Sequence, residues 1–286
     1  MSSATAPTKP KLWRRAVRIL QTVIIAYVLF VLAAAIFQRR LIYFPRNIPA
    51  ALAEPAATEL GFVPWRNPSG QIIGWKLPAA SSPVASVLIT HGNAGCAIDR
   101  GYLANPIHVA APVDVYVLDY PGYGSRAGSP NKQSFLAAGE EAFGLLTNGL
   151  PKYLVSESIG AGVICYLAKA HSTEVAGLVL FMPYHNLASV AQRKMPLLPA
   201  YLLLLDRFNP AECLRDYRVP VKIVLAGADE IIPVESGRRL FEGYAGPKNL
   251  QIIRAALHAD SSRGGDQVAG DSTARRDGVD RTIAGH

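Results

Sequence analysis

The chain has 286 residues, enough for one sizeable domain and an extra segment, and half of them are hydrophobic. The net charge is +8, but eight of the 29 basic residues lie in the first 46 positions, which hold no acidic residue, so the rest is balanced at 21 of each sign. This balance excludes a basic nucleic-acid-binding face in the globular part. Three scattered cysteines exclude a disulfide framework, and we predict no metal site and no cofactor.

An apolar segment at 19–38 follows a basic N-terminal segment at 1–18, and no charged residue interrupts it. A helix of this length spans about 30 Å, which matches the hydrocarbon core of a bilayer. A buried core helix would show a polar face, and this segment has none. A cleaved signal peptide, with small residues at 33–35 for cleavage, is the alternative, but the apolar run is longer than is usual for one.

The charges that flank this segment complete the prediction. The run ends in Gln38, Arg39 and Arg40, which are typical of a stop for translocation, so we expect an uncleaved, single-pass signal anchor. More basic residues precede the segment than follow it. This excess favours a cytoplasmic N-terminus and a catalytic domain on the non-cytoplasmic side.

The remainder of the chain alternates short apolar runs with helical patterns. After a linker and edge segment at 39–70, candidate strands lie at 71–77, 85–90, 113–118, 152–155, 176–181, 221–226 and 250–254, and candidate helices at 98–108, 132–148, 160–171 and 234–244. Most of the strands are apolar on both faces, as in a parallel sheet covered by helices. The pattern predicts an α/β domain over 71–260, with its ligand site beyond the carboxyl ends of the strands.

The end of the strand at 152–155 carries a candidate nucleophile. The residues at 156–160 read Ser-Glu-Ser-Ile-Gly and resemble the nucleophile elbow G-x-S-x-G, a sharp strand-to-helix turn that holds a strained serine. The residues two before and two after the serine must be small, because strand and helix pass closely there. Gly160 meets this requirement, and Ser156 replaces the usual glycine. We predict Ser158 as the nucleophile; a helix start capped by serine is the alternative.

Three other strand ends carry groups that complement a nucleophilic serine. The strand at 85–90 runs into His-Gly-Asn-Ala-Gly at 91–95, a loop whose glycines let a backbone N–H approach a developing negative charge. The strand at 221–226 leads to Asp229, with Glu230 as the second choice for an acid. His258 follows the last strand, 29 residues after Asp229.

Together these motifs resemble the alpha/beta-hydrolase superfamily. Residues 119–130 look like its loop pattern D-x-x-G-x-G-x-S-x-G-x-P, and residues 181–184, Phe-Met-Pro-Tyr, resemble its S-P-Y segment. With the segment Arg-Arg-Leu-Ile-Tyr-Phe-Pro at 39–45, the chain is similar to the single-pass, membrane-anchored branch of serine hydrolases over residues 19–258. The resemblance implies an alpha/beta-hydrolase fold, a mostly parallel sheet with helices on both faces, preceded by one transmembrane helix.

The resemblance also implies a role for each motif residue. The catalytic triad would be Ser158 as nucleophile, Asp229 as acid and His258 as base, in the chain order of this fold. The oxyanion hole would use the backbone N–H groups of Asn93 and Ile159. The supporting loop positions are His91, Gly92, Gly95 and Gly160, and we expect His91 to order its loop rather than to act as the base.

The remaining segments bear on the substrate. Residues 184–210 form an apolar insertion between strands, and we expect either a small lid over the site or a buried helix. Residues 261–286 nearly lack large apolar side chains, which predicts a disordered or aberrant tail. We expect hydrolysis of an ester, thioester or related acyl bond on a small-molecule or lipid-like substrate. A non-catalytic, membrane-tethered binding module and a serine peptidase are the alternatives.

Overall fold

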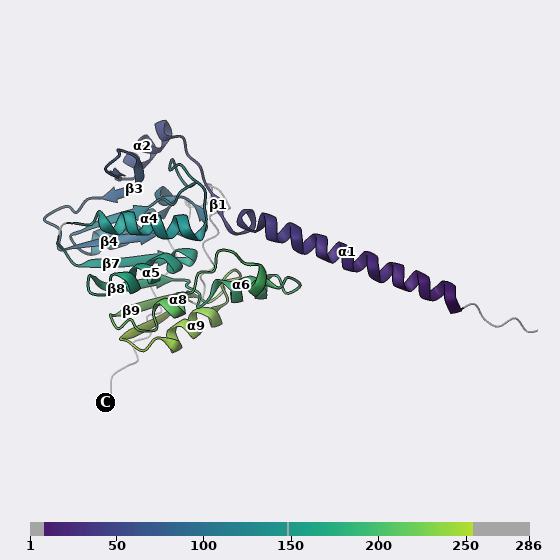
Figure 1. Cartoon of the computed structure of the whole chain (residues 1–286). Coiled ribbons are helices and arrows are strands. Elements are labelled where there is room, and N and C mark those ends of the chain that lie inside the picture. The colour runs from purple at the N-terminus through teal and green to yellow at the C-terminus, as the bar shows by residue number, and fades with distance from the viewer. Residues whose placement is uncertain (1–8, 148, 254–286) are drawn as a thin grey trace, which may run out of the picture.

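The computed structural model describes residues 9–147 and 149–253. The predicted base His258 and the predicted tail at 261–286 lie outside the described residues. The described chain forms a sheet with helices packed against it and one long helix that projects away from it (Figure 1).

The sheet has eight strands in the order β10-β9-β8-β7-β4-β6-β3-β2. Neighbours from β10 to β6 are parallel, whereas β3 pairs antiparallel with both β6 and β2. These strands are β2 (Val63–Arg66), β3 (Ile72–Leu77), β4 (Ala85–Thr90), β6 (Val113–Leu118), β7 (Lys152–Glu157), β8 (Val175–Phe181), β9 (Val221–Ala226) and β10 (Lys248–Ile253). The predicted mostly parallel sheet is confirmed, and each predicted strand is present with its ends shifted by at most two residues.

Helices cover both faces of the sheet. The helices are α1 (Lys9–Ile42), α2 (Ala50–Glu59), α3 (Gly101–Ala110), α4 (Lys132–Gly144), α5 (Ala161–Ala170), α6 (Leu187–Lys194), α7 (Ala200–Leu203), α8 (Pro210–Cys213) and α9 (Val234–Gly243). Residues of α4, α5 and α9 belong to one buried apolar cluster, and residues of α2 and α3 belong to another. Within β4, Leu88 lies in the first cluster while Val87 and Ile89 lie in the second, as alternating side chains on a two-sided sheet must.

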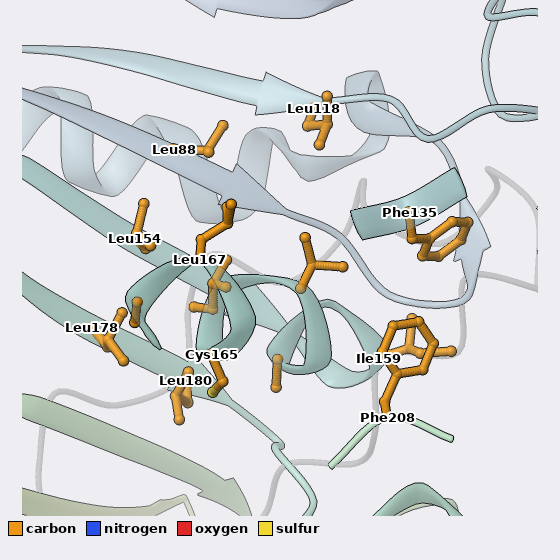
Figure 2. Close-up of a cluster of buried hydrophobic side chains, with 14 of the residues drawn as sticks. Leu88, Leu118, Phe135, Leu154, Ile159, Cys165, Leu167, Leu178, Leu180 and Phe208 are labelled. Carbon is orange, nitrogen blue, oxygen red and sulfur yellow. The ribbon is translucent and has the colours of Figure 1, made fainter. Parts of the chain in front are cut away.

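The larger cluster holds the site strand in place. Figure 2 shows Leu88, Leu154 and Leu178 on adjacent strands beside Leu167 of α5, the helix that follows the candidate nucleophile. These side chains are almost wholly buried. Full burial of one leucine contributes about 1.5–3 kcal/mol, so this layer fixes α5 firmly against β7.

Helix α1 is long and apolar enough to cross a membrane. Its Trp13–Ile42 portion has 30 residues, and the most apolar 18-residue window within it has a mean hydropathy of 2.6. It projects away from the sheet, and its contacts with the rest of the fold lie in its C-terminal half, from Tyr27 onwards (Figure 1). The predicted segment at 19–38 lies inside this helix, which continues to Ile42.

The segment at 39–70 is more ordered than a linker. It contains the end of α1, the two-residue strand β1 (Phe44–Pro45), helix α2 and the expected edge strand β2. The expectation of a plain linker was wrong because alanine has the highest helix propensity, and Ala53 and Ala57 are buried in the second cluster. This packing stabilises α2 despite Pro55 within it.

Candidate active site

The turn after β7 holds Ser158 in a strained conformation. Its φ is 50°, in the left-handed region that non-glycine residues rarely adopt. Strain of this kind persists where the surrounding fold imposes it, and it is common at functional sites. A short 3-10 turn, Ser158–Gly160, joins β7 to α5, so the serine lies at a sharp strand-to-helix turn.

Close backbone packing explains why small residues flank Ser158. A Cβ atom on Gly160 would lie 2.5 Å from the Thr90 carbonyl oxygen and 2.9 Å from that of His91. Two positions before Ser158, Ser156 is fully buried and pairs with Thr90 across β7 and β4. A serine therefore fits where the elbow pattern has glycine.

The loop after β4 lies beside this turn because β4 and β7 are neighbours in the sheet. Here β5 (Ala94–Gly95) pairs in parallel with β1. The Asn93 side-chain amide donates to the Ile42 carbonyl at 2.8 Å, and the Asn93 carbonyl accepts from the Phe44 N–H at 2.8 Å and the Tyr123 hydroxyl at 2.7 Å. These bonds tie the predicted oxyanion loop to the end of α1.

His91 is buried beneath the same loop. Its Nδ1 lies 2.7 Å from the Gly92 carbonyl oxygen, so Nδ1 carries the proton and donates it there. Burial, with the positive charge of Arg100 as a smaller cause, lowers the pKa of His91 to about 3. Its ring packs against those of Tyr120 and Tyr123, with centroids 4.5 and 5.1 Å away. His91 is thus neutral, and it supports the loop.

A buried ion pair next to Ser158 was not predicted from the sequence. The Glu157 carboxylate lies 2.8 Å from Nε of Arg100 and accepts from the Tyr102 hydroxyl at 2.7 Å. Arg100 also donates to the Ala94 carbonyl at 2.5 Å. Both members of the pair are about 2% exposed. The pair links the residue before Ser158 to the oxyanion loop, and removing one partner would leave an uncompensated buried charge.

The predicted acid lies on the loop after β9. Oδ1 of Asp229 accepts hydrogen bonds from the backbone N–H groups of Ile231 and Ile232, both at 2.8 Å, which fix its carboxylate. Both isoleucines line the same cavity as Ser158, so the acid's loop borders the site. The predicted base His258 lies outside the described residues.

A cavity of about 320 Å³ opens over Ser158. The residues at its base are Asn93, Ser158, Ile159 and Tyr184. The insertion at 184–210, which contains α6 and α7, supplies much of the apolar wall, including Leu187, Val190, Leu198, Leu203 and Leu204. Of the predicted site residues, the structure brings Ser158, Ile159 and Asn93 together in this cavity. Among the described residues, no group of three or more His, Cys, Asp or Glu is arranged to hold a metal ion.

Comparison with known proteins identifies the family to which the chain belongs. No protein-family model matches the chain. The chain is 33% identical over 232 residues to uncharacterized protein Rv2307c of Mycobacterium tuberculosis, covering 78% of this chain and 81% of that protein. It is 25% identical to lysophosphatidylserine lipase ABHD12 of Macaca fascicularis, covering 68% and 55%. The solved esterase Pf2001 of Pyrococcus furiosus matches with a TM-score of 0.56 at 16% identity, covering 76% and 89%. The chain belongs to the alpha/beta-hydrolase superfamily.

One wall of this alpha/beta hydrolase's cavity was not predicted from the sequence. The last turns of α1 contribute Ala34, Gln38, Leu41 and Ile42 to it. The spacing i, i+4, i+7, i+8 was the available signal, because it places all four side chains on one face of the helix. The uniformly apolar composition of the segment concealed that face.

Proposed function

We propose that this alpha/beta hydrolase is a membrane-anchored serine hydrolase that cleaves the ester bond of a lipid-like acyl substrate. One observation carries the proposal: Ser158, with a φ of 50°, lies at the base of an apolar cavity beside Asn93 and Ile159. The names of two similar proteins, a lysophosphatidylserine lipase and an esterase, favour an ester over a peptide bond.

The reaction would proceed through an acyl-enzyme. His258 takes the proton of the Ser158 hydroxyl as Oγ attacks the ester carbonyl carbon. The backbone N–H groups of Asn93 and Ile159 stabilise the oxyanion, and Asp229 orients the histidine. His258 then protonates the departing alcohol. Water, activated by the same base, cleaves the acyl-Ser158 ester, releases the acid and restores the serine.

The size and lining of the cavity support a single acyl chain as the substrate group. Its volume of about 320 Å³ is at the small end of ligand pockets, which span roughly 300–1,000 Å³. Most of its lining side chains are aliphatic, which recognise hydrocarbon; the polar exceptions are Gln38, Asn93, Ser158, Tyr184 and Lys194.

Helix α1 would anchor the enzyme in the bilayer, where a lipid-like substrate is found. Its apolar segment at 19–38 is long enough for a bilayer, and the basic residues before that segment favour a cytoplasmic N-terminus, with the domain on the opposite side. Glycosylation-site insertion into an exposed loop of the domain would report the orientation.

The test is hydrolysis of nitrophenyl esters by the full-length protein in detergent, with amide substrates in parallel. Ser158→Ala is expected to lower kcat/KM by about 10⁴-fold or more. Ser156→Ala, two residues away and equally buried, serves as the matched control and is expected to keep its activity. Equal activity of wild type and Ser158→Ala would refute the assignment. Amide turnover exceeding ester turnover would indicate a peptidase, and an inactive wild type a binding module.

A further inference from the structure

One face of α1 is built to contact the domain. Ala34, Gln38, Leu41 and Ile42 line the cavity, whereas the neighbouring Ile36 is 73% exposed. A helix that served only as a tether would need a uniformly lipid-compatible surface and no such face. The C-terminal end of α1 is therefore part of the site's wall.

Hydrogen bonds hold this face in register with the insertion at 184–210. The Gln38 side-chain amide donates to the Leu203 carbonyl at 3.2 Å and accepts from the Leu205 N–H at 2.8 Å. Nε of Arg39 lies 3.0 Å from Oδ2 of Asp206, a buried carboxylate. Two-sided bonding of an amide to a backbone segment fixes the helix's rotation as well as its position.

The position of each lining residue along α1 gives the wall a direction. The Ile42 carbonyl accepts the Asn93 amide, so that end of the wall lies at the predicted oxyanion loop. Ala34 is eight residues earlier, about 12 Å along the helix axis. An acyl chain lying against this face would run from the loop towards Ala34, where a methyl group leaves room.

The insertion presents exposed apolar side chains on the same side of the molecule. Leu197 is 75% and Leu202 is 79% exposed, and the Leu197 carbonyl accepts a hydrogen bond from the Tyr27 hydroxyl of α1 at 2.9 Å. This apolar surface is thus continuous with the membrane-length helix. A bilayer is the environment that covers both without exposing leucines to water.

We propose that α1 is a wall of the acyl site as well as an anchor: its Ala34–Ile42 face holds the acyl chain of a lipid entering from the bilayer, and the small side chain of Ala34 leaves room for the far end of that chain. The proposal rests on the ester hydrolase function inferred above. It adds a specificity determinant that belongs to the anchor rather than to the globular domain.

The first experiment measures binding without turnover. Full-length Ser158→Ala protein in nanodiscs is irradiated with a fatty acid that carries a terminal diazirine, and the cross-linked residues are mapped by mass spectrometry. We expect labelling of α1 around Ala34 that excess unlabelled fatty acid suppresses. Labelling spread evenly over α1, or suppressible labelling confined to the insertion, would overturn the proposal. This result does not depend on whether the protein hydrolyses esters.

The second experiment measures chain-length preference. We expect Ala34→Phe to lower the ratio of kcat/KM for laurate over butyrate esters by about tenfold or more, since the fit of a single methylene group in a hydrophobic pocket is worth roughly 10–200-fold. Ala33→Phe is the matched control, because Ala33 is exposed and is not among the cavity-lining residues. An unchanged ratio in Ala34→Phe, or the same change in both variants, would overturn the proposal. If the wild type hydrolyses esters and Ala34→Phe leaves the ratio unchanged, only the proposed role of α1 is refuted. If the wild type hydrolyses no ester, the proposed function itself is refuted.

Discussion

The two halves of the site differ in how they are built. The base of the cavity comes from the ends of β4 and β7, adjacent strands whose loops hold Asn93 and Ser158. Much of the remaining wall comes from α1 and the insertion at 184–210, segments more than a hundred residues apart. Backbone geometry fixes the base, and side-chain hydrogen bonds such as those of Gln38 fix the wall.

This difference indicates a division of roles. Chemistry depends on positions held within fractions of an ångström, which a strained turn between packed strands provides. Substrate choice depends on the shape of an apolar space, which a helix and an insertion can change without disturbing the sheet. Substitutions at the base should therefore affect turnover, and substitutions at the wall should affect docking and preference.

Among substitutions that keep Ser158, Gly160→Ala is expected to have the largest effect. The added Cβ would lie 2.5 Å from the Thr90 carbonyl oxygen, so strand or helix must shift. A displacement of about 1 Å costs roughly 100-fold in rate, and overpacking costs about 1–3 kcal/mol of unfolding free energy. Ester turnover and thermal melting measure both.

Gly144→Ala is the control for that substitution. A Cβ at Gly144, in the last turn of α4, meets no atom within 4 Å. This variant should keep full activity and equal or slightly higher stability, since alanine is the better helix former. Full activity in Gly160→Ala would show that close packing at the turn does not hold Ser158 in place.

Gln38→Leu should have a smaller effect, confined to the wall. The change leaves the Leu205 N–H and the Leu203 carbonyl without their partner, which costs about 1–3 kcal/mol. We expect a lower melting temperature in detergent and faster proteolysis of the insertion. Gln21→Leu, an exposed position on the same helix, is the control and should change neither. Equal stability of Gln38→Leu and wild type would mean that these bonds do not hold α1 to the insertion.

His91 predicts an effect on stability alone, a dependence of the unfolding free energy on pH. Burial lowers its pKa from 6.5 to about 3 in the folded state, so between these values the unfolded chain binds a proton that the folded protein does not. Stability is therefore complete above pH 6.5 and falls as the pH drops towards 3, by at most about 1.4 kcal/mol per pH unit.

Denaturant unfolding between pH 4 and pH 7 measures this slope. Asp119, whose Oδ1 lies 4.0 Å from Nε2 of His91, contributes with the opposite sign because burial raises its pKa to about 6. The difference between wild type and His91→Asn isolates the histidine. Identical slopes in the two proteins would mean that His91 is not held neutral by burial.

The sheet could be predicted from the sequence because its strands are local apolar runs of the correct length. The sharp turn at Ser158 was also predictable from neighbouring residues. Gly160, two residues later, stands where the close approach of strand and helix admits only a small residue. The wall could not be predicted, because the contacts of Gln38 with Leu203 and Leu205 join segments about 165 residues apart. The same holds for Arg100 and Glu157, whose pairing only the folded topology reveals.

The most direct test of the central claim is covalent labelling of the nucleophile. Full-length protein and its Ser156→Ala and Ser158→Ala variants are treated with a fluorophosphonate, digested, and mapped by mass spectrometry. We predict one phosphonylated residue, Ser158, in wild type and in Ser156→Ala, and no adduct in Ser158→Ala. An adduct on another serine, or equal labelling of Ser158→Ala, would contradict the account.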